Sequence, residues 1–286
     1  MAAAAPPMTA RTATLTAIAL VCFAGNSLLC RAALRPHAID AASFTLVRLA
    51  SGALVLAVLS RAKKSDAPTT TTREVAAPIA LFAYAIAFSL AYLRLPAGTG
   101  ALLLFGAVQT TMLVVAVRGG ERPRPLAWLG MVLAASGLVG LTLPGLGAPE
   151  PTSAALMLVA GVAWGAYTLR GRGAKDPLAL TARNFAWTVP LAAVAFGIAL
   201  ALGVHAEPKG VLLAAASGAI ASGIGYSVWY TALRGLSATR AAVLQLAVPV
   251  LTAAAGIAFL GEQVSMRLVL SSVTILGGIA LVVLKR

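Results

Sequence analysis

Few residues of this chain could perform acid–base or metal chemistry, and their positions argue against it. The eight carboxylates and two histidines all fall in polar connections or at the ends of long apolar stretches: Asp40, Asp66, Glu74, Glu121, Glu150, Asp176, Glu207, Glu262, His37 and His205. The sequence has no HExxH motif, no phosphate-binding glycine-rich loop before a lysine, and no histidine beside a nucleophile. We therefore expect no catalytic residue, no metal site and no cofactor, and we do not expect an enzyme.

Aromatic residues make up only 6% of the chain, so their spacing is informative. Ser222, Tyr226, Trp229 and Tyr230 recur at i, i+4, i+7 and i+8, the spacing of one helix face. Further aromatic residues lie inside other apolar stretches: Tyr84, Phe88, Tyr92, Trp164 and Tyr167. Such rings and hydroxyls favour an amphipathic cavity that stacks planar substrates. The competing interpretation is a belt of aromatic residues at a lipid–water interface, which fits Tyr92 and Trp128.

Four polar side chains interrupt apolar stretches and could bind the polar end of a substrate. Arg48 could attract a substrate carboxylate, although an arginine in this position could also extend to lipid headgroups or pair with a helix end. Amides such as Asn26, Gln109 and Gln245 can bind a ligand or join helices to one another. The complete candidate substrate-binding set is Asn26, Arg48, Tyr84, Gln109, Trp164, Tyr167, Tyr226, Tyr230 and Gln245.

The composition indicates what kind of scaffold must position these residues. The chain is 60% hydrophobic and 10% charged, with a mean hydropathy of +0.92, too few charges to cover a soluble domain. Continuous apolar stretches near the length that crosses a bilayer predict an all-α polytopic membrane protein. Ten spans are expected at 12–33, 40–60, 75–94, 98–117, 124–143, 153–170, 178–202, 209–233, 238–259 and 266–284.

The net charge of +14 reflects membrane topology rather than a nucleic-acid partner. The 22 lysines and arginines are scattered over short segments and form no basic face with aromatic readers. With the N-terminus inside, the inner segments hold 15 of them and the outer segments five. This bias predicts a multi-pass protein with both termini in the cytoplasm.

Two Gly-Glu pairs mark an internal repeat. Glu121 and Glu262 lie 141 residues apart, close to half of the 286-residue chain. At the same offset, "LPAGTGALLLFGAV" (95–108) aligns with "LSATRAAVLQLAVP" (236–249). We predict two five-helix repeats, 1–147 and 148–286, of opposite orientation around a central cavity, as in many secondary transporters. Glu121 and Glu262 are then structural corners that cap or pair at the turns between the fourth and fifth and the ninth and tenth spans.

The chain resembles the ten-helix, EamA-like branch of the drug/metabolite transporter superfamily. The resemblance rests on "FAGNSLLCRAAL", "FTLVRLASGALVL" and the stretch from Ala232 to Glu262, and it extends over essentially the whole chain. Among members, the chain is most similar to bacterial aromatic amino-acid exporters. It departs from the common pattern at Ala24-Gly25, where a Trp-Gly pair is usual. The resemblance implies a basket of helices whose walls are spans 1, 3, 4, 6, 8 and 9.

These observations together predict a secondary transporter that exports aromatic or neutral amino acids, or similar small metabolites, by alternating access. Its location would be the bacterial inner membrane, and its partners a small amphiphilic substrate and lipid, with no nucleic acid. Ten helices can enclose one pathway, so a monomer suffices. Because no carboxylate lies mid-span, we expect exchange or facilitated diffusion. The alternatives are multidrug or other metabolite efflux within the superfamily and, outside it, a membrane-embedded enzyme or sensor.

Overall fold

The protein folds almost entirely into membrane-length helices, as expected. A computed structural model describes residues 8–61, 72–120, 125–145, 148–171, 174–236, 241 and 244–284. In these ranges there is no strand, only an isolated β-bridge between Ile39 and Ala206. Eight helices are long and apolar enough to cross a membrane, and two apolar helices are shorter. This confirms the prediction of an all-α polytopic membrane protein.

Where the chain is described, the helices follow the expected spans within a few residues. The first seven are α1 (Ala10–Leu34), α2 (Ala41–Arg61), α3 (Thr72–Tyr92), α4 (Ala97–Arg118), α5 (Pro125–Thr142), α6 (Pro151–Gly171) and α7 (Pro177–Leu200). The eighth span comprises α8 (Pro208–Ala216), the π-helix η1 (Ser217–Ile224) and α9 (Gly225–Leu233). In the ninth, Ala241, Leu244 and Gln245 are helical and α11 (Ala247–Leu260) follows, whereas residues 237–240 and 242–243, where the predicted span begins, lie outside the described residues. The tenth span is α12 (Met266–Leu284).

Helix starts are set by proline and by acidic caps. Proline is the first residue of α5, α6, α7 and α8, where its missing N–H has no partner to lose. The Asp40 carboxylate accepts hydrogen bonds from the backbone N–H groups of Ala42 and Ser43. Asp176 does the same for the first turn of α7. These carboxylates at the helix ends therefore have structural partners.

The eighth span differs from the regular helix expected over 209–233, because eight residues in its middle form a π-helix. This segment is rich in small residues and packs closely along α2. A Cβ atom added at Gly218 would collide with the Arg48 carbonyl oxygen and the Ser51 hydroxyl. Glycine therefore permits the two backbones to approach at this point.

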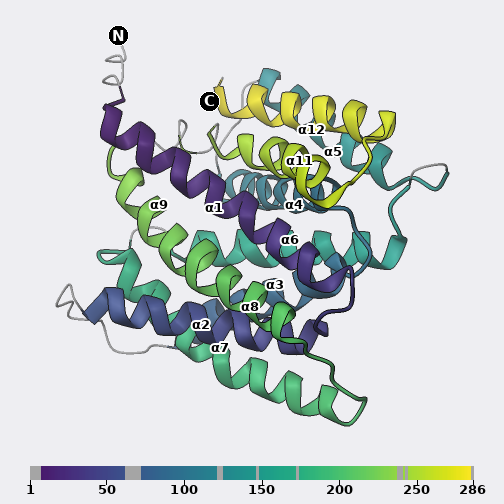
Figure 1. Cartoon of the computed structure of the whole chain (residues 1–286). Helices are drawn as coiled ribbons and strands as arrows, with labels where there is room; N and C mark the ends of the chain where they lie inside the picture. Colours follow the sequence, from purple (N-terminus) through teal and green to yellow (C-terminus); the bar gives the residue numbers. More distant parts are fainter. Residues whose placement is uncertain are drawn as a thin grey trace.

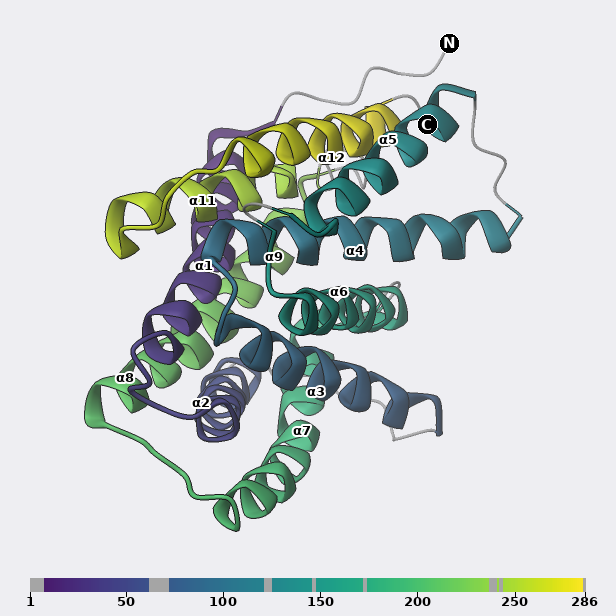
Figure 2. The ribbon, with the colours of Figure 1, turned by 90° about the vertical axis from the view of Figure 1, so that its right-hand side faces the viewer.

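The helices stack in layers that relate the first five spans to the last five. Figure 2 shows α5 and α12 over α4, followed by α6 and α3, with α2 and α7 farther down. α2 packs on α7, α4 on α11 and α5 on α12. In each pair, one of the first five spans packs on the span at the same position among the last five. α3 packs on α6, and the eighth span, which takes the place of α3 in the second half, packs on α1. In the same way α4 packs on α6, and α11 packs on α1. Exchanging the halves thus maps each of these pairs onto another; the boundary at residue 147 stays a prediction.

Figure 1 orients the bundle for the description of the cavity. The start of α1 and the end of α12 lie at the same end of the bundle. The end of α6 and the start of α7 also lie there, at the left of the view. We call this the terminal end. The charge bias predicts that it faces the cytoplasm.

Candidate functional site

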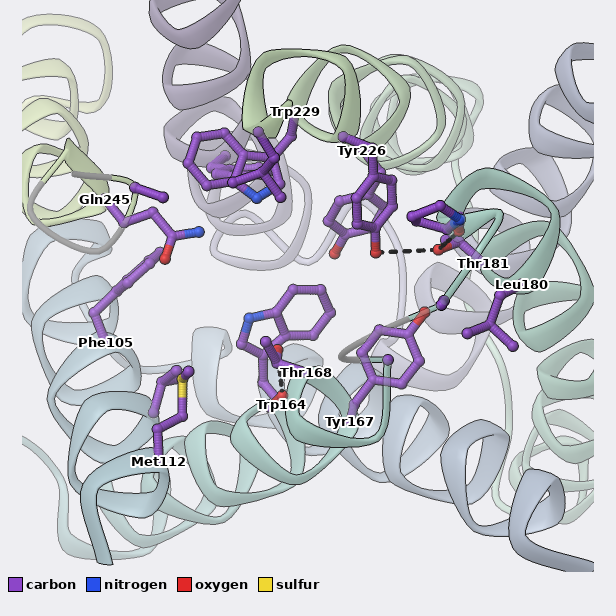
Figure 3. Close-up of a pocket in the computed structure, with 18 of the residues that line it drawn as sticks. Phe105, Met112, Trp164, Tyr167, Thr168, Leu180, Thr181, Tyr226, Trp229 and Gln245 are labelled. Atoms are coloured by element: carbon purple, nitrogen blue, oxygen red, sulfur yellow. Dashed lines mark hydrogen bonds between the residues drawn. The ribbon is translucent and has the colours of Figure 1, made fainter. Parts of the chain in front are cut away.

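A cavity of about 330 Å³ lies between helices from both halves of the chain. We call it the main cavity. Figure 3 shows α6 contributing Trp164 and Tyr167 opposite Tyr226 and Trp229 of the eighth span. Its remaining wall comes from α1, α4, α7 and the residues before α11: Phe23, Phe105, Val108, Gln109, Met112, Leu180, Thr181, Ala241 and Gln245. The main cavity reaches Gly171, Ala174 and Pro177, so it extends toward the terminal end.

Trp164 is at the centre of the aromatic wall. Its ring stacks on Tyr226 with centroids 5.4 Å apart and planes 20° apart. It also contacts Tyr84 and Tyr167, at 4.8 and 5.3 Å between centroids. Phe23 closes the other side of Tyr226 at 5.8 Å. The stacked and tilted rings form a continuous surface suited to planar apolar groups.

The polar groups of the main cavity are few and dispersed. Gln109 and Gln245 enter from spans four and nine. On the α7 side, the Thr181 hydroxyl and the Tyr230 hydroxyl form a hydrogen bond of 3.1 Å. A mainly apolar cavity with a few placed polar groups is the usual composition of a small-molecule site.

A smaller recess of about 30 Å³ adjoins the main cavity. The two spaces share Phe23, Phe105, Trp164, Tyr226 and Gln245 as lining residues. Only the recess is lined by residues of α3 and by the polar part of α1: Asn26, Ser27, Tyr84 and Phe88. The recess therefore gives the apolar cavity a polar inner end.

Arg48 lies behind this recess and is 1% exposed. Its Nη2 group donates a hydrogen bond of 3.0 Å to the Tyr84 hydroxyl. Its guanidinium carbon lies 5.2 Å from the centroid of the Tyr84 ring and 4.9 Å from that of Phe88. Among the described residues, Nε and Nη1 of Arg48 have no hydrogen-bond acceptor. The two aromatic faces are thus the main compensation for this buried cation.

The structure brings the candidate residues of the sequence together. Eight of the nine line the main cavity or the recess: Asn26, Tyr84, Gln109, Trp164, Tyr167, Tyr226, Tyr230 and Gln245. Arg48 is joined to them through Tyr84. Whether they bind substrate stays a prediction.

Several lining residues were missed by the sequence reasoning. Phe105, Val108 and Met112 lie on the same stripe of α4 as the predicted Gln109, at a helical spacing from which they could have been found. Thr181 and Leu180 bring α7 into the wall, whereas the resemblance implied only spans 1, 3, 4, 6, 8 and 9. Nothing in the local sequence around Thr181 distinguishes its inward face from its other faces.

At the end opposite to the terminal end, Glu262 joins parts of the chain that are distant in sequence. Its carboxylate lies 3.4 Å from Arg31 Nε of α1 and accepts hydrogen bonds of 2.9 and 2.8 Å from the Ala97 backbone N–H. Glu262 was expected to act at the turn between the ninth and tenth spans, but its partners lie on α1 and at the start of α4. Its neighbour Gly261 adopts a φ of 62°, as a glycine at a helix C-terminus commonly does.

Glu121, the other predicted corner, lies outside the described residues. The preceding Gly120 is described and has a φ of 94°. Both Gly-Glu pairs therefore place their glycine in the left-handed region, which favours residues without a side chain. This explains why each corner carries a glycine.

The fold and the cavity together define a multi-pass membrane protein built around a small-molecule site. A family model described as the EamA-like transporter family matches residues 152–284. An uncharacterized protein of Pseudomonas aeruginosa is 52% identical over 280 residues, covering 96% of both chains. Residues 152–284 are thus a domain of the EamA-like transporter family, within the drug/metabolite transporter superfamily.

A solved structure shows how far this architecture extends. A crystal structure described only as that of a protein matches with a TM-score of 0.68. It covers 96% of this chain and 97% of the other, at 20% sequence identity. At this identity the likeness concerns the fold alone. It shows that the arrangement of helices seen here also occurs in a chain of distant sequence.

Proposed function

We propose that this protein exports aromatic or neutral amino acids across the bacterial inner membrane by alternating access. The observation that carries the proposal is the main cavity, which lies between the two halves and is lined by stacked aromatic rings. Its volume of about 330 Å³ falls within the roughly 300–1,000 Å³ typical of small-molecule sites. A planar side chain fits the ring surface around Trp164, while Gln109 and Gln245 can bind polar substrate groups.

The extension of the main cavity toward one end of the bundle supports loading of substrate from that end. It reaches the connection between α6 and α7, at the end that the charge bias predicts to be cytoplasmic. The opposite end is joined by Arg31, Glu262 and the start of α4. Under the predicted topology this is an inward-facing conformation, which would load substrate from the cytoplasm. Export requires that these outer contacts separate in a second conformation.

A counterflow experiment tests the proposal. Purified protein in liposomes is loaded with one unlabelled amino acid, and uptake of trace labelled L-phenylalanine is followed against protein-free liposomes. We expect phenylalanine, tyrosine, tryptophan and leucine to support exchange. If amphiphilic drugs are exchanged and amino acids are not, the multidrug alternative is favoured. Absence of flux for all these solutes would favour an embedded enzyme or sensor.

A further inference from the structure

The starting observation is the unmatched charge of Arg48. Arg31 pairs with Glu262 and His205 pairs with Glu207, and neither ion pair includes Arg48. A buried arginine normally pairs with an anion or saturates its five N–H groups with acceptors. Here Nε and Nη1 both lack an acceptor in the part of the chain that the structure describes. The site therefore has cationic donors in excess of acceptors.

The hydrogen bonds of the Tyr84 hydroxyl add one more donor to the unpaired N–H groups of Arg48. The Tyr84 hydroxyl accepts from Arg48 Nη2 at 3.0 Å and from Asn26 Nδ2 at 3.2 Å. Asn26 is fixed in this orientation because its Oδ1 accepts a 2.7 Å hydrogen bond from Ser217. With both lone pairs of the phenol occupied, its own hydrogen remains available to donate. Arg48 and Tyr84 thus present donors with no acceptor among these partners.

The recess offers room for the missing acceptor beside Tyr84. A water-sized group needs about 10–15 Å³ of such space, so a recess of about 30 Å³ holds roughly two. Two oxygens on one planar carbon are what a carboxylate presents. Trp164 and Tyr226 line both spaces, so a group in the recess lies next to the rings of the main cavity.

We propose that Arg48 and Tyr84 form an anion subsite that takes the carboxylate of the transported solute, while its side chain lies against the aromatic wall. The inference rests on the proposed function and narrows it, because solutes must carry a carboxylate. Amines and cationic amphiphiles of the same shape would meet the Arg48 charge and be rejected.

A ligand series on purified wild-type protein tests the carboxylate requirement. The probes are L-phenylalanine, 3-phenylpropionate, L-phenylalaninamide and phenethylamine, which share one ring and differ in the carboxylate and the amine. Binding is measured by the shift in melting temperature and by competition in counterflow. We expect the two carboxylates to bind at least about tenfold more tightly than the amide and the amine, as expected for a charge-assisted hydrogen bond. Equal binding of phenylalanine and its amide would overturn the subsite.

Variants separate binding from a structural role. Arg48→Met should lose the preference for carboxylates and should match or exceed the wild-type melting temperature without ligand, because it removes an unpaired buried charge. Tyr84→Phe should weaken carboxylate binding about tenfold. The matched control is Arg94→Met, since Arg94 is exposed and should leave both measurements unchanged. A lower melting temperature of Arg48→Met with an unchanged preference would show that Arg48 only supports the fold.

The two proposals fail in different ways. In one outcome no solute shows flux, but 3-phenylpropionate shifts the melting temperature of the wild type and does not shift that of Arg48→Met. This outcome would refute the exporter and leave the subsite. Amino-acid exchange that phenethylamine inhibits as well as phenylalanine does would leave the exporter and refute the subsite.

Discussion

Arg31 and Glu262 lie 231 residues apart in sequence, yet their side chains meet at 3.4 Å with 9% of each exposed. Arg31 also contacts the end of α3, and Glu262 also contacts the start of α4. Arg31 Nη1 donates to the carbonyl oxygens of Tyr92 and Leu93, and Glu262 accepts from the Ala97 N–H. This ion pair therefore connects α1, the α3–α4 turn and the α11–α12 turn in one network.

Replacing Glu262 with Ala should destabilise the protein. The change leaves Arg31 without its anion and leaves the first N–H of α4 without an acceptor, a loss of about 3 kcal/mol for a mostly buried pair. The measurement is the melting temperature in detergent. Glu207→Ala is the control, because its contact with His205 is exposed and should contribute little. If both variants melt alike, the network carries no stability.

Replacing Trp164 with Ala should weaken exchange without reducing expression. Trp164 contacts Tyr84, Tyr167 and Tyr226, so its loss removes the surface on which a planar substrate would stack. We expect the KM for phenylalanine in counterflow to rise about tenfold, since stacking on an aromatic ring contributes about 1 kcal/mol and lost apolar contact adds to it. Trp187→Ala is the matched control, because Trp187 is 56% exposed on α7. Equal effects of both variants would argue against a substrate role.

Exchange should proceed without a proton gradient. The carboxylate residues in the described part of the chain are Asp40, Glu74, Glu150, Asp176, Glu207 and Glu262, and all lie in the first turn or at the end of a helix or in a connection. No carboxylate of this set is placed mid-membrane to carry a proton across. Counterflow at equal pH on both sides should thus be as fast as in the presence of a gradient. Uphill accumulation that collapses on addition of a protonophore would contradict this prediction.

Replacing Gly218 with Ala should disturb the packing of the eighth span on α2. A Cβ there meets the Arg48 carbonyl oxygen, and overpacking of this kind costs about 1–3 kcal/mol. Gly197→Ala is the control, because no atom lies within 4 Å of its added Cβ. Gly218→Ala should melt at a lower temperature than wild type, and Gly197→Ala should not. A thermally silent Gly218→Ala would show that the two helices separate easily.

The positions of the helices could be predicted from the sequence better than the contacts between side chains of different helices. Hydropathy and proline positions locate most spans within a few residues, because each span must satisfy its own backbone in lipid. The aromatic spacing around Tyr226 correctly indicated an inward-facing stripe. The partners of Glu262, in contrast, depend on how α1 and α4 approach the α11–α12 turn, and no local pattern encodes that approach. Thr181 was missed for the same reason.

The buried donors of Arg48 illustrate this limit. Its position within an apolar stretch marked Arg48 as unusual. That its Nε and Nη1 have no acceptor among the described residues could be recognised only after Tyr84, Phe88 and Asn26 were placed around it. A sequence pattern identifies a charge; it does not identify what surrounds the charge.

The π-helix over residues 217–224 also sets the rotational phase of the eighth span. A π turn contains more residues than an α turn, and each residue of an α-helix advances the face by about 100°. If the same eight residues wound as a regular α-helix, each would advance the face by a larger angle than in the wider π turn, and α9 would turn relative to α8. Tyr226, Trp229 and Tyr230 would then leave the main cavity while α8 stayed in place. The wide turn is thus the element that aims the aromatic residues of the second half at those of the first.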